Sequence, residues 1–107
     1  KTGTIVFMGS TSGIIGWEGH VNLAVGKFGL RALAQVMSRE LHPLGIHVAH
    51  LIIDGDILEK PVDEESEPYL DPKNISEMIS FLHKQAPSAW SQELDIRPWN
   101  ENFWQYC

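Results

Sequence analysis

Three short stretches of the chain carry side chains that could do chemistry. Ser10 follows an apolar run, Lys27 comes seventeen residues later, and the turn Asp54-Gly55-Asp56-Ile57 follows a second apolar run. A serine hydroxyl can hydrogen-bond a polar ligand, and a lysine ammonium can stabilise negative charge that develops in a reaction. Both residues also have plainer interpretations. A serine in a turn often bonds nearby backbone, and a lysine on a polar helix stripe is often solvated or ion-paired.

The glycines after the first apolar run favour a loop. Gly9, Gly13 and Gly16 resemble a turn that cradles phosphate at a helix N-terminus. Four residues separate Gly16 from the helical pattern that follows, however, and no acidic residue ends a second strand about 20 residues on, where a ribose would be held. We therefore interpret residues 9–20 as a flexible loop.

The histidines and the cysteine form no metal-binding or nucleophilic pattern. His47 and His50 lie three residues apart on a predicted strand, which places their side chains on opposite faces. A metal shared by these two side chains is therefore excluded, and we predict no metal site. The single cysteine, Cys107, cannot form an internal disulfide, which indicates a reducing compartment and a cytoplasmic protein.

Hydrophobic periodicity predicts alternating strands and helices. The first apolar run is rich in β-branched residues and reads as a strand buried on both faces. Asp71 and Pro72 give the second predicted helix an N-cap and a favourable first turn. The predicted elements are a strand at 4–8, a loop at 9–20, a helix at 21–42, a strand at 45–53, an acidic loop at 54–70, a helix from 71 that ends before Pro87, a strand at 89–97 and an aromatic tail at 98–107.

This order of elements indicates an α/β fold. Helices that are longer than hairpin loops imply parallel strands joined by right-handed crossovers. We expect a small three-layer unit with about three parallel strands and two crossover helices. Residues 1–107 form one incomplete domain, in which 1–57 carry the motifs and 58–107 hold the acidic loop, a helix, a strand and the tail.

The predicted helix at 21–42 is apolar over most of its circumference. Its polar side chains recur every three or four residues and form one narrow stripe: Lys27, Arg31, Gln35, Ser38 and Arg39. An apolar arc this wide exceeds what one sheet face covers, so a second surface should pack on it. We expect a homo-oligomer that associates through this helix.

The composition excludes several classes of protein and partner. The 107 residues are 43% hydrophobic and 21% charged, as in a soluble globular domain, and collagen-like or low-complexity chains are excluded. A net charge of −6 argues against a nucleic-acid partner, because phosphate binding needs clustered Lys and Arg. No apolar run reaches the roughly 20 residues of a membrane span, and no leader opens the chain. The start at Lys1 suggests processing or a longer product.

One spacing fits a known family. Ser10, Lys27 on the long helix and the turn at 54–57 resemble the carboxyl-terminal half of the short-chain dehydrogenase/reductase family, over residues 3–57. That family has a Ser after its fifth strand, a Tyr-x-x-x-Lys pair on the next helix and a Pro-Gly-x-Val-like turn after the sixth strand. Residues 28–35 and 45–48 are typical of its helix and strand. The resemblance implies a partial Rossmann-like fold and an NAD(P)-dependent oxidoreductase.

The resemblance also implies roles for individual residues. Ser10 would hydrogen-bond the substrate carbonyl, and Lys27 would hold the nicotinamide ribose and lower the pKa of a neighbouring phenol. The turn with Asp54, Gly55 and Ile57 would line the nicotinamide amide of NAD or NADP. These roles suit hydride transfer, because the developing alkoxide needs a proton and a nearby ammonium helps to supply it. In the family the long helix pairs with its symmetry mate, which implies an isologous dimer.

The chain departs from the family pattern at three places. Leu23 stands four residues before Lys27, where the family has its proton-donating Tyr, and an alkyl group donates no proton. Asn22 does not titrate and points about 100° away around a helix, and nothing in the sequence brings His20 to the site. Asp54 replaces the turn proline and would repel a pyrophosphate. The glycine fingerprint and first four strands of the family are absent from these residues.

Two hypotheses of function follow. In the first, the chain is the substrate-side portion of an NAD(P)-dependent oxidoreductase, inactive alone, whose cofactor half lies upstream of Lys1. In the second, it is a non-catalytic interaction or structural module that kept the scaffold and lost the chemistry. Leu23 and the missing glycine fingerprint favour the second, whereas the spacing of Ser10, Lys27 and Gly55 favours the first.

Overall fold

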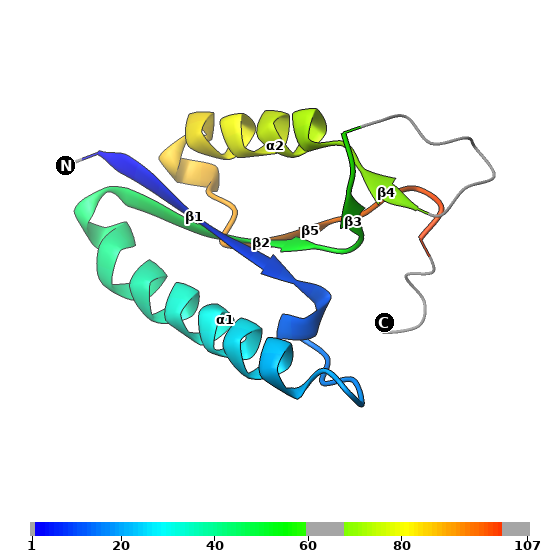
Figure 1. Ribbon diagram of the computed structural model, residues 1–107. Coiled ribbons are helices and arrows are strands. Elements are labelled where there is room, and N and C mark those ends of the chain that lie inside the picture. Colours follow the sequence, from blue (N-terminus) through cyan, green and yellow to red (C-terminus); the bar gives the residue numbers. More distant parts are fainter. Residues whose placement is uncertain (1, 60–67, 102–107) are drawn as a thin grey trace.

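A computed structural model describes residues 2–59 and 68–101 (Figure 1). Strands and helices alternate along the chain, with short 3-10 turns at Thr11–Gly13, His42–Leu44 and Pro87–Ala89. The helices and strands are β1 (Gly3–Ser10), α1 (Val21–Leu41), β2 (Ile46–Ile53), β3 (Asp56–Ile57), β4 (Tyr69–Leu70), α2 (Pro72–Lys84) and β5 (Glu93–Ile96).

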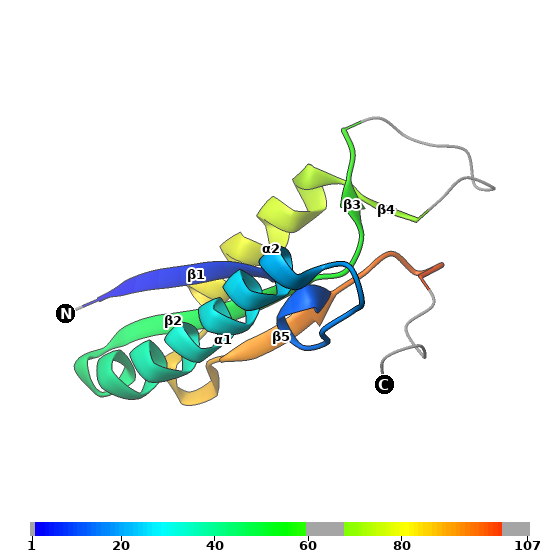
Figure 2. The same cartoon turned by 60° about the horizontal axis from the view of Figure 1, so that its bottom comes forward.

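The main sheet has three parallel strands in the order β1-β2-β5. Figures 1 and 2 show α1 on one face of this sheet and α2 on the other. The predicted α/β fold with three parallel strands and two crossover helices is confirmed, and the layers are those of a Rossmann-like unit.

The first strand differs from its prediction in burial. Residues 4–8 were expected to be buried on both faces, but most of β1 is only half-buried. The reason is its place in the sheet: β2 lies on one side of β1, and no strand in the described part of the chain lies on the other. The strand also extends to Ser10, so this serine ends the strand instead of following it.

Two further boundaries differ from the predictions. The stretch predicted as an acidic loop contains β3 and β4, which pair in parallel through Asp56 with Tyr69 and Ile57 with Leu70. The third main strand is shorter than residues 89–97, because a 3-10 turn at Pro87–Ala89 occupies its predicted start. Residues 60–67 of the acidic run and residues 102–107 of the aromatic tail, with Cys107, lie outside the described residues.

The apolar core lies between the sheet and α2. Asp71 caps this helix by accepting a hydrogen bond from the backbone N–H of Lys73 at 2.9 Å, and Pro72 follows at the first position, as predicted. The apolar face of α2 then packs on the sheet. The core residues are Leu51, Ile53, Leu70 and Ile75, with Val6, Met78, Ile79, Leu94 and Ile96 around them.

Helix α1 turns much of its apolar arc away from the sheet. Only Ala34 and Ser38 are buried, whereas Val25 is 70% and Val36 is 52% exposed. The polar stripe lies beside the sheet, since Ser38 donates a hydrogen bond to the Val48 carbonyl oxygen at 3.3 Å. The arc therefore has no covering surface within the described residues, which is the exposure expected of a helix that packs on a second surface. None of the helices in the described ranges combines the length and apolarity of a membrane-crossing segment.

Candidate functional site

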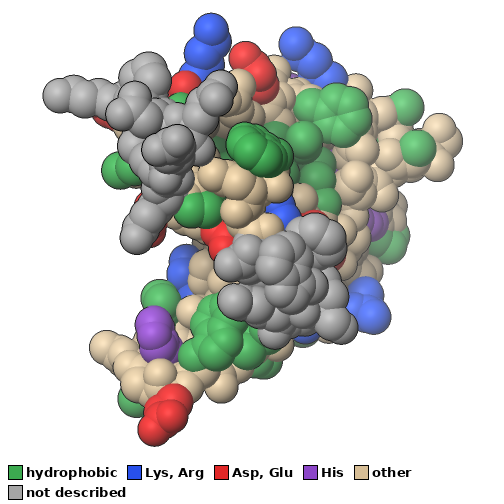
Figure 3. Space-filling model, turned by 90° about the vertical axis from the view of Figure 1, so that its right-hand side faces the viewer, with side chains coloured by type: hydrophobic (Ala, Val, Ile, Leu, Met, Phe, Trp, Pro, Cys, Tyr) green, Lys and Arg blue, Asp and Glu red, His purple; other side chains and the backbone are tan. Residues whose placement is uncertain are grey.

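The carboxyl ends of the three main strands meet at one edge of the sheet. β1 ends at Ser10, β2 ends at Ile53 just before Asp54, and β5 ends at Ile96 just before Arg97. In open parallel sheets, ligands bind in the crevice outside this edge. Figure 3 views the molecule from this side and shows hydrophobic side chains interspersed with charged ones.

Lys27 reaches this edge from α1. Its Nζ donates a hydrogen bond to the backbone oxygen of Met8 at 3.0 Å, two residues before Ser10. The 3-10 turn after β1 packs closely on the same part of the helix, because a Cβ on Gly13 would lie 2.9 Å from the Lys27 backbone oxygen. This close packing is a structural reason for the glycine, which the sequence suggested only as part of a loop.

Ser10 presents a buried hydroxyl at the same edge. Its Oγ has no hydrogen-bond partner in the described part of the chain. The two residues that follow, Thr11 and Ser12, are themselves buried. A buried hydroxyl without a partner costs free energy, so this atom is suited to bind an oxygen or nitrogen of a ligand.

The negative charge of Asp54 is compensated by Arg97, which directly follows β5. The residue is only 8% exposed, and its backbone N–H donates to the Ile96 carbonyl oxygen at 3.0 Å. The Arg97 Nη1 lies 3.7 Å from the Asp54 Oδ2, and the Arg97 guanidinium also bonds Asp95. Sequence analysis treated Asp54 as an uncompensated negative charge. That view is corrected by Arg97, whose approach depends on β5 pairing with β2.

The turn after Asp54 requires glycine and leads to an exposed apolar side chain. Gly55 has a φ of +145°, and a Cβ there would lie 3.2 Å from Pro98. Ile57 follows on β3 and is half-exposed. The residues predicted to line a nicotinamide amide therefore lie at the carboxyl edge, as the resemblance required, and their role remains a prediction.

The first turn of α1 carries no proton donor at the family's position. Leu23 is half-exposed and lies one turn before Lys27. His20 is the N-cap residue of the helix, and its ring contacts Trp17 edge-on at 6.4 Å between centroids. Among the described residues, neither side chain forms a hydrogen bond with Ser10 or Lys27 that would make it an acid for this site.

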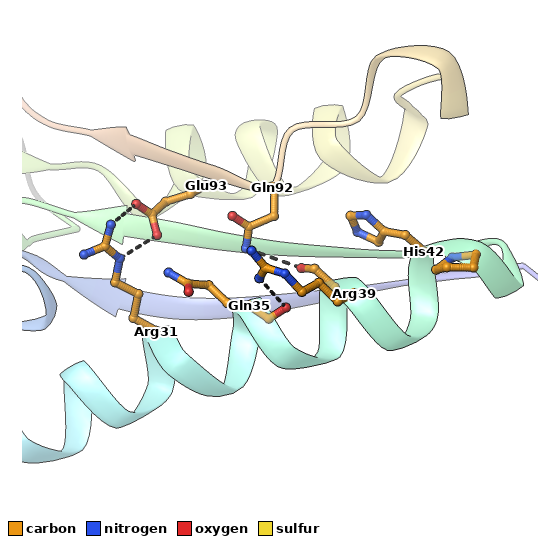
Figure 4. A pocket seen from close by; sticks show the side chains of 8 residues that line it. Arg31, Gln35, Arg39, His42, Gln92 and Glu93 are labelled. Atoms are coloured by element: carbon orange, nitrogen blue, oxygen red, sulfur yellow. Dashed lines mark hydrogen bonds and ion pairs between the residues drawn. The ribbon is translucent and has the colours of Figure 1, made fainter.

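A polar network behind this edge ties α1 to the sheet. Arg31, one turn after Lys27, binds both oxygens of Glu93 at 2.9 Å (Figure 4). His50 Nδ1 lies 3.2 Å from the Glu93 Oε2. Because a carboxylate only accepts, Nδ1 of His50 carries a proton. His50 is fully buried, and a Cβ on Gly9 would lie 2.1 Å from its Nε2. The network thus reaches from the helix of Lys27 to the strand of Ser10.

The charges in this network stabilise one another. Burial raises the pKa of Glu93, but the hydrogen bonds and charges of Arg31 and His50 outweigh it and hold that pKa below its usual value of 4.5. The hydrogen bond to Glu93 raises the pKa of Arg31 above its usual value. Sequence reasoning missed this network, because His50 and Glu93 are 43 residues apart and become neighbours only through strand pairing.

A groove of about 570 Å³ runs between α1 and the start of β5, away from the carboxyl edge (Figure 4). Arg39 donates there to the Gln35 backbone oxygen at 3.3 Å, and the Gln92 amide donates to Ser38. The groove shows that the polar stripe of α1 faces β5. The lining residues are Arg31, Gln35, Ser38, Arg39, His42, Pro43, Gln92 and Glu93.

Comparisons with known proteins agree with this geometry. No family model matches the chain. The chain is 35% identical over 92 residues to the 3-oxoacyl-(acyl-carrier-protein) reductase FabG of Aggregatibacter actinomycetemcomitans, a match that covers 77% of this chain and 38% of that protein. Among solved structures, a short-chain dehydrogenase from Rhodopseudomonas palustris matches with a TM-score of 0.75 and 41% identity, over 92% of this chain and 39% of that one.

A more distant structure shows the fold alone. A serine dehydrogenase in its closed form with NADP+ matches with a TM-score of 0.76 at 16% identity, over 92% of this chain and 45% of that one. The chain therefore spans less than half the length of these relatives, between 38% and 45%. The parallel sheet, the match to the dehydrogenase from Rhodopseudomonas palustris and the match to the reductase agree, and the chain belongs to the short-chain dehydrogenase/reductase family.

Proposed function

We propose that the chain is the carboxyl-terminal, substrate-side portion of an NAD(P)-dependent oxidoreductase and that it is inactive alone. The observation that carries this proposal is the Lys27 ammonium bound at Met8, two residues before the buried and unpartnered hydroxyl of Ser10. Family membership supports an oxidoreductase scaffold. Leu23, at the family's tyrosine position, supports the absence of the proton donor.

The described residues fit the nicotinamide end of NAD(P). When bound, this cofactor would supply or accept the hydride. Lys27 would leave Met8 and hold the ribose, while the backbone at Gly55 and Ile57 would line the amide. The buried Asp54 does not oppose such a ligand as an isolated anion would, because Arg97 lies 3.7 Å away. Two relatives whose structures hold NADP or a derivative of it share this fold, which supports the cofactor class.

Ser10 would orient the substrate by donating a hydrogen bond from Oγ to its carbonyl oxygen. The Lys27 ammonium would stabilise the negative charge that develops on that oxygen. Neither residue replaces a titrating acid at the position of Leu23, so the proton needed by the alkoxide has no source on the described part of α1. The expected result is weak cofactor binding and no measurable carbonyl reduction.

The experiment is a titration of the chain with NADH and NADPH, followed by an assay of carbonyl reduction. We expect no affinity tighter than about millimolar from this chain alone, since many family contacts to the cofactor lie outside the matched portion. Measurable reduction by the wild-type chain would contradict the missing acid. Leu23→Tyr restores the family's Tyr-x-x-x-Lys pair, and Leu23→Phe is the matched control that adds a ring without a hydroxyl.

A non-catalytic interaction module is the second candidate, and Leu23 also favours it. The two candidates differ in their response to the restored tyrosine. If cofactor fluorescence changes on addition of the chain and Leu23→Tyr gains reduction while Leu23→Phe does not, the oxidoreductase site is retained. If Leu23→Tyr binds NADH or NADPH but gains no reduction over Leu23→Phe, the non-catalytic module is the correct interpretation.

We also propose a homodimer through α1 and a cytoplasmic location, with no nucleic-acid or membrane partner. Val25, Phe28 and Val36 are exposed hydrophobic residues on the helix face away from the sheet. A self-complementary face of this kind suits a two-fold interface. Light scattering should give the dimer mass for the wild-type chain and the monomer mass for Val36→Asp. A compact wild-type monomer at micromolar concentration would contradict the dimer.

A further inference from the structure

His47 lies on the face of β2 opposite His50 and has a different set of partners. The residue is 2% exposed. Its Nδ1 lies 3.1 Å from the carbonyl oxygen of Leu82, and its Nε2 lies 2.7 Å from the carbonyl oxygen of Ser91. Both ring nitrogens therefore face an atom that can only accept a hydrogen bond.

A neutral imidazole cannot satisfy this arrangement. It carries a single N–H, so one nitrogen would direct a lone pair at a carbonyl oxygen inside a site that excludes water. The imidazolium carries an N–H on each nitrogen and makes both bonds. We propose that His47 is a proton-dependent staple. With a proton on both nitrogens it joins β2 to the end of α2 and to the segment that enters β5, and loss of one proton breaks one of these joins.

The surroundings of the ring favour the positive charge. Trp90 stacks on His47 with 4.7 Å between ring centroids and 5° between the planes, which places the cation over the indole face. Leu82 lies in the last turn of α2, where the carbonyl groups form the negative end of the helix dipole. The same side chain thus has two charge-assisted hydrogen bonds, an aromatic face and a helix terminus of the right polarity.

The titratable groups around the staple are basic. The His42 ring lies 5.9 Å from the His47 ring, and its Nε2 accepts a hydrogen bond from the Val48 backbone N–H at 3.1 Å. On α2, His83 bonds Thr4, which is the register partner of His47 on β1, and Lys84 follows in the same turn. Within residues 2–59 and 68–101, no ion pair joins an acidic side chain to His47. The attraction of the two carbonyl groups and the indole ring for the imidazolium must therefore exceed its repulsion by these basic neighbours.

A proton on both His47 nitrogens determines whether the stability of the fold rises or falls with pH. If the folded chain holds the His47 proton more tightly than the unfolded chain does, the staple stabilises the fold at low pH and this contribution is lost as the pH rises. This direction is opposite to that of Glu93, whose contribution is lost as the pH falls. The inference concerns the described fold alone and does not depend on the proposed oxidoreductase activity.

The direct test is nuclear magnetic resonance of the wild-type chain labelled with ¹⁵N. Long-range correlations across the imidazole ring show whether one or both nitrogens carry a proton. Because His42 also contacts the Trp90 ring, at 5.1 Å between centroids, the His47 resonances are identified by their absence in His47→Gln. An unperturbed histidine loses its proton near about pH 6.5. At about pH 7.5 we nevertheless expect a proton on both His47 nitrogens, because each faces a carbonyl oxygen. A bare nitrogen on His47 at that pH overturns the proposal.

A second test compares the pH dependence of unfolding. Urea unfolding of the wild-type chain and His47→Gln is measured at about pH 6 and about pH 8.5. Over this range the unfolding constant of the wild-type chain should rise about tenfold more than that of His47→Gln. His83→Gln is the matched control and should keep the wild-type dependence. Equal dependence in the wild-type chain and His47→Gln, or its loss in His83→Gln, would overturn the assignment to His47.

Discussion

The two faces of β2 are held by different interactions. On the α2 face, aliphatic side chains such as Leu51, Ile53 and Ile75 form a buried core. On the α1 face, the Arg31–Glu93 ion pair with His50 and the hydrogen bond from Ser38 to Val48 lie beside the buried Ala34, and Ile52 is buried on the same face of the strand. The core on the α2 face is therefore aliphatic, whereas the α1 face combines apolar contacts with an ion pair and hydrogen bonds.

The two faces therefore differ in what they contribute, because one mainly stabilises the fold and the other positions Lys27 relative to Ser10. Full burial of an aliphatic side chain stabilises a fold by about 1.5–3 kcal/mol, whereas a partly exposed ion pair contributes about 0–1 kcal/mol. We therefore expect most of the stability to come from the α2 face. The α1 face contributes less stability, but it fixes the helix that carries Lys27 against the strand that carries Ser10.

The largest effect should come from the α2 face. Leu82 is fully buried, and Leu82→Ala removes three heavy atoms from a packed site, so we expect a loss of about 2–5 kcal/mol in the free energy of unfolding. Its neighbour Phe81 is 56% exposed, and Phe81→Ala should cost less than about 1 kcal/mol. Urea unfolding measures both values. Equal losses in the two variants would mean that α2 is not attached by its apolar face.

An intermediate effect is expected where β1 meets the α1 face. Gly9→Ala places a Cβ 2.1 Å from the buried Nε2 of His50, so the ring or the strand must shift, at a cost of about 1–3 kcal/mol. Gly29 is the matched control in α1, because a Cβ there meets nothing within 4 Å. Gly29→Ala should stabilise the chain by about 0.5–1 kcal/mol. A stable Gly9→Ala in thermal unfolding would show that His50 is not held in place by Glu93.

The main elements could be predicted from the sequence because their signals are local. The N-cap at Asp71, the apolar face of α2 and the β-branched start of β1 depend on neighbours a few residues away. The two faces occupied by His47 and His50 follow from the two-residue period of a strand, and the structure confirms them. The resemblance carried by Ser10 and Lys27 implied a shared site, and Lys27 bonds the backbone of Met8, two residues before Ser10, while the roles of both residues stay a prediction.

What the sequence did not reveal depends on pairing between distant segments. Arg97 compensates Asp54 only because β5 lies beside β2, and the half-burial of β1 follows from its place at the edge of the sheet. The sequence did not predict which way the polar stripe of α1 points, and in the structure Ser38 of this stripe is buried against Val48. Helical periodicity tells which side chains share a face, and it does not tell which face a sheet will cover.

The smallest effect should be a pH dependence on the α1 face. The pKa of Glu93 is held below its usual value of 4.5 by Arg31 and His50. A lowered carboxyl pKa gives stability that is fully present above the usual value and is lost as the pH falls through the folded-state value. Because Arg31 is 36% exposed, we expect this contribution to be only about 1 kcal/mol. Glu93→Gln should therefore reduce the loss of stability between about pH 6 and about pH 3 by that amount in urea unfolding.

The control is Glu40→Gln, on the exposed side of α1, which should leave the pH dependence of stability unchanged. Identical profiles for the wild-type chain and Glu93→Gln would mean that the ion pair does not attach α1 to the sheet, and the hydrogen bonds from Lys27 to Met8 and from Ser38 to Val48 would then be the polar contacts that do.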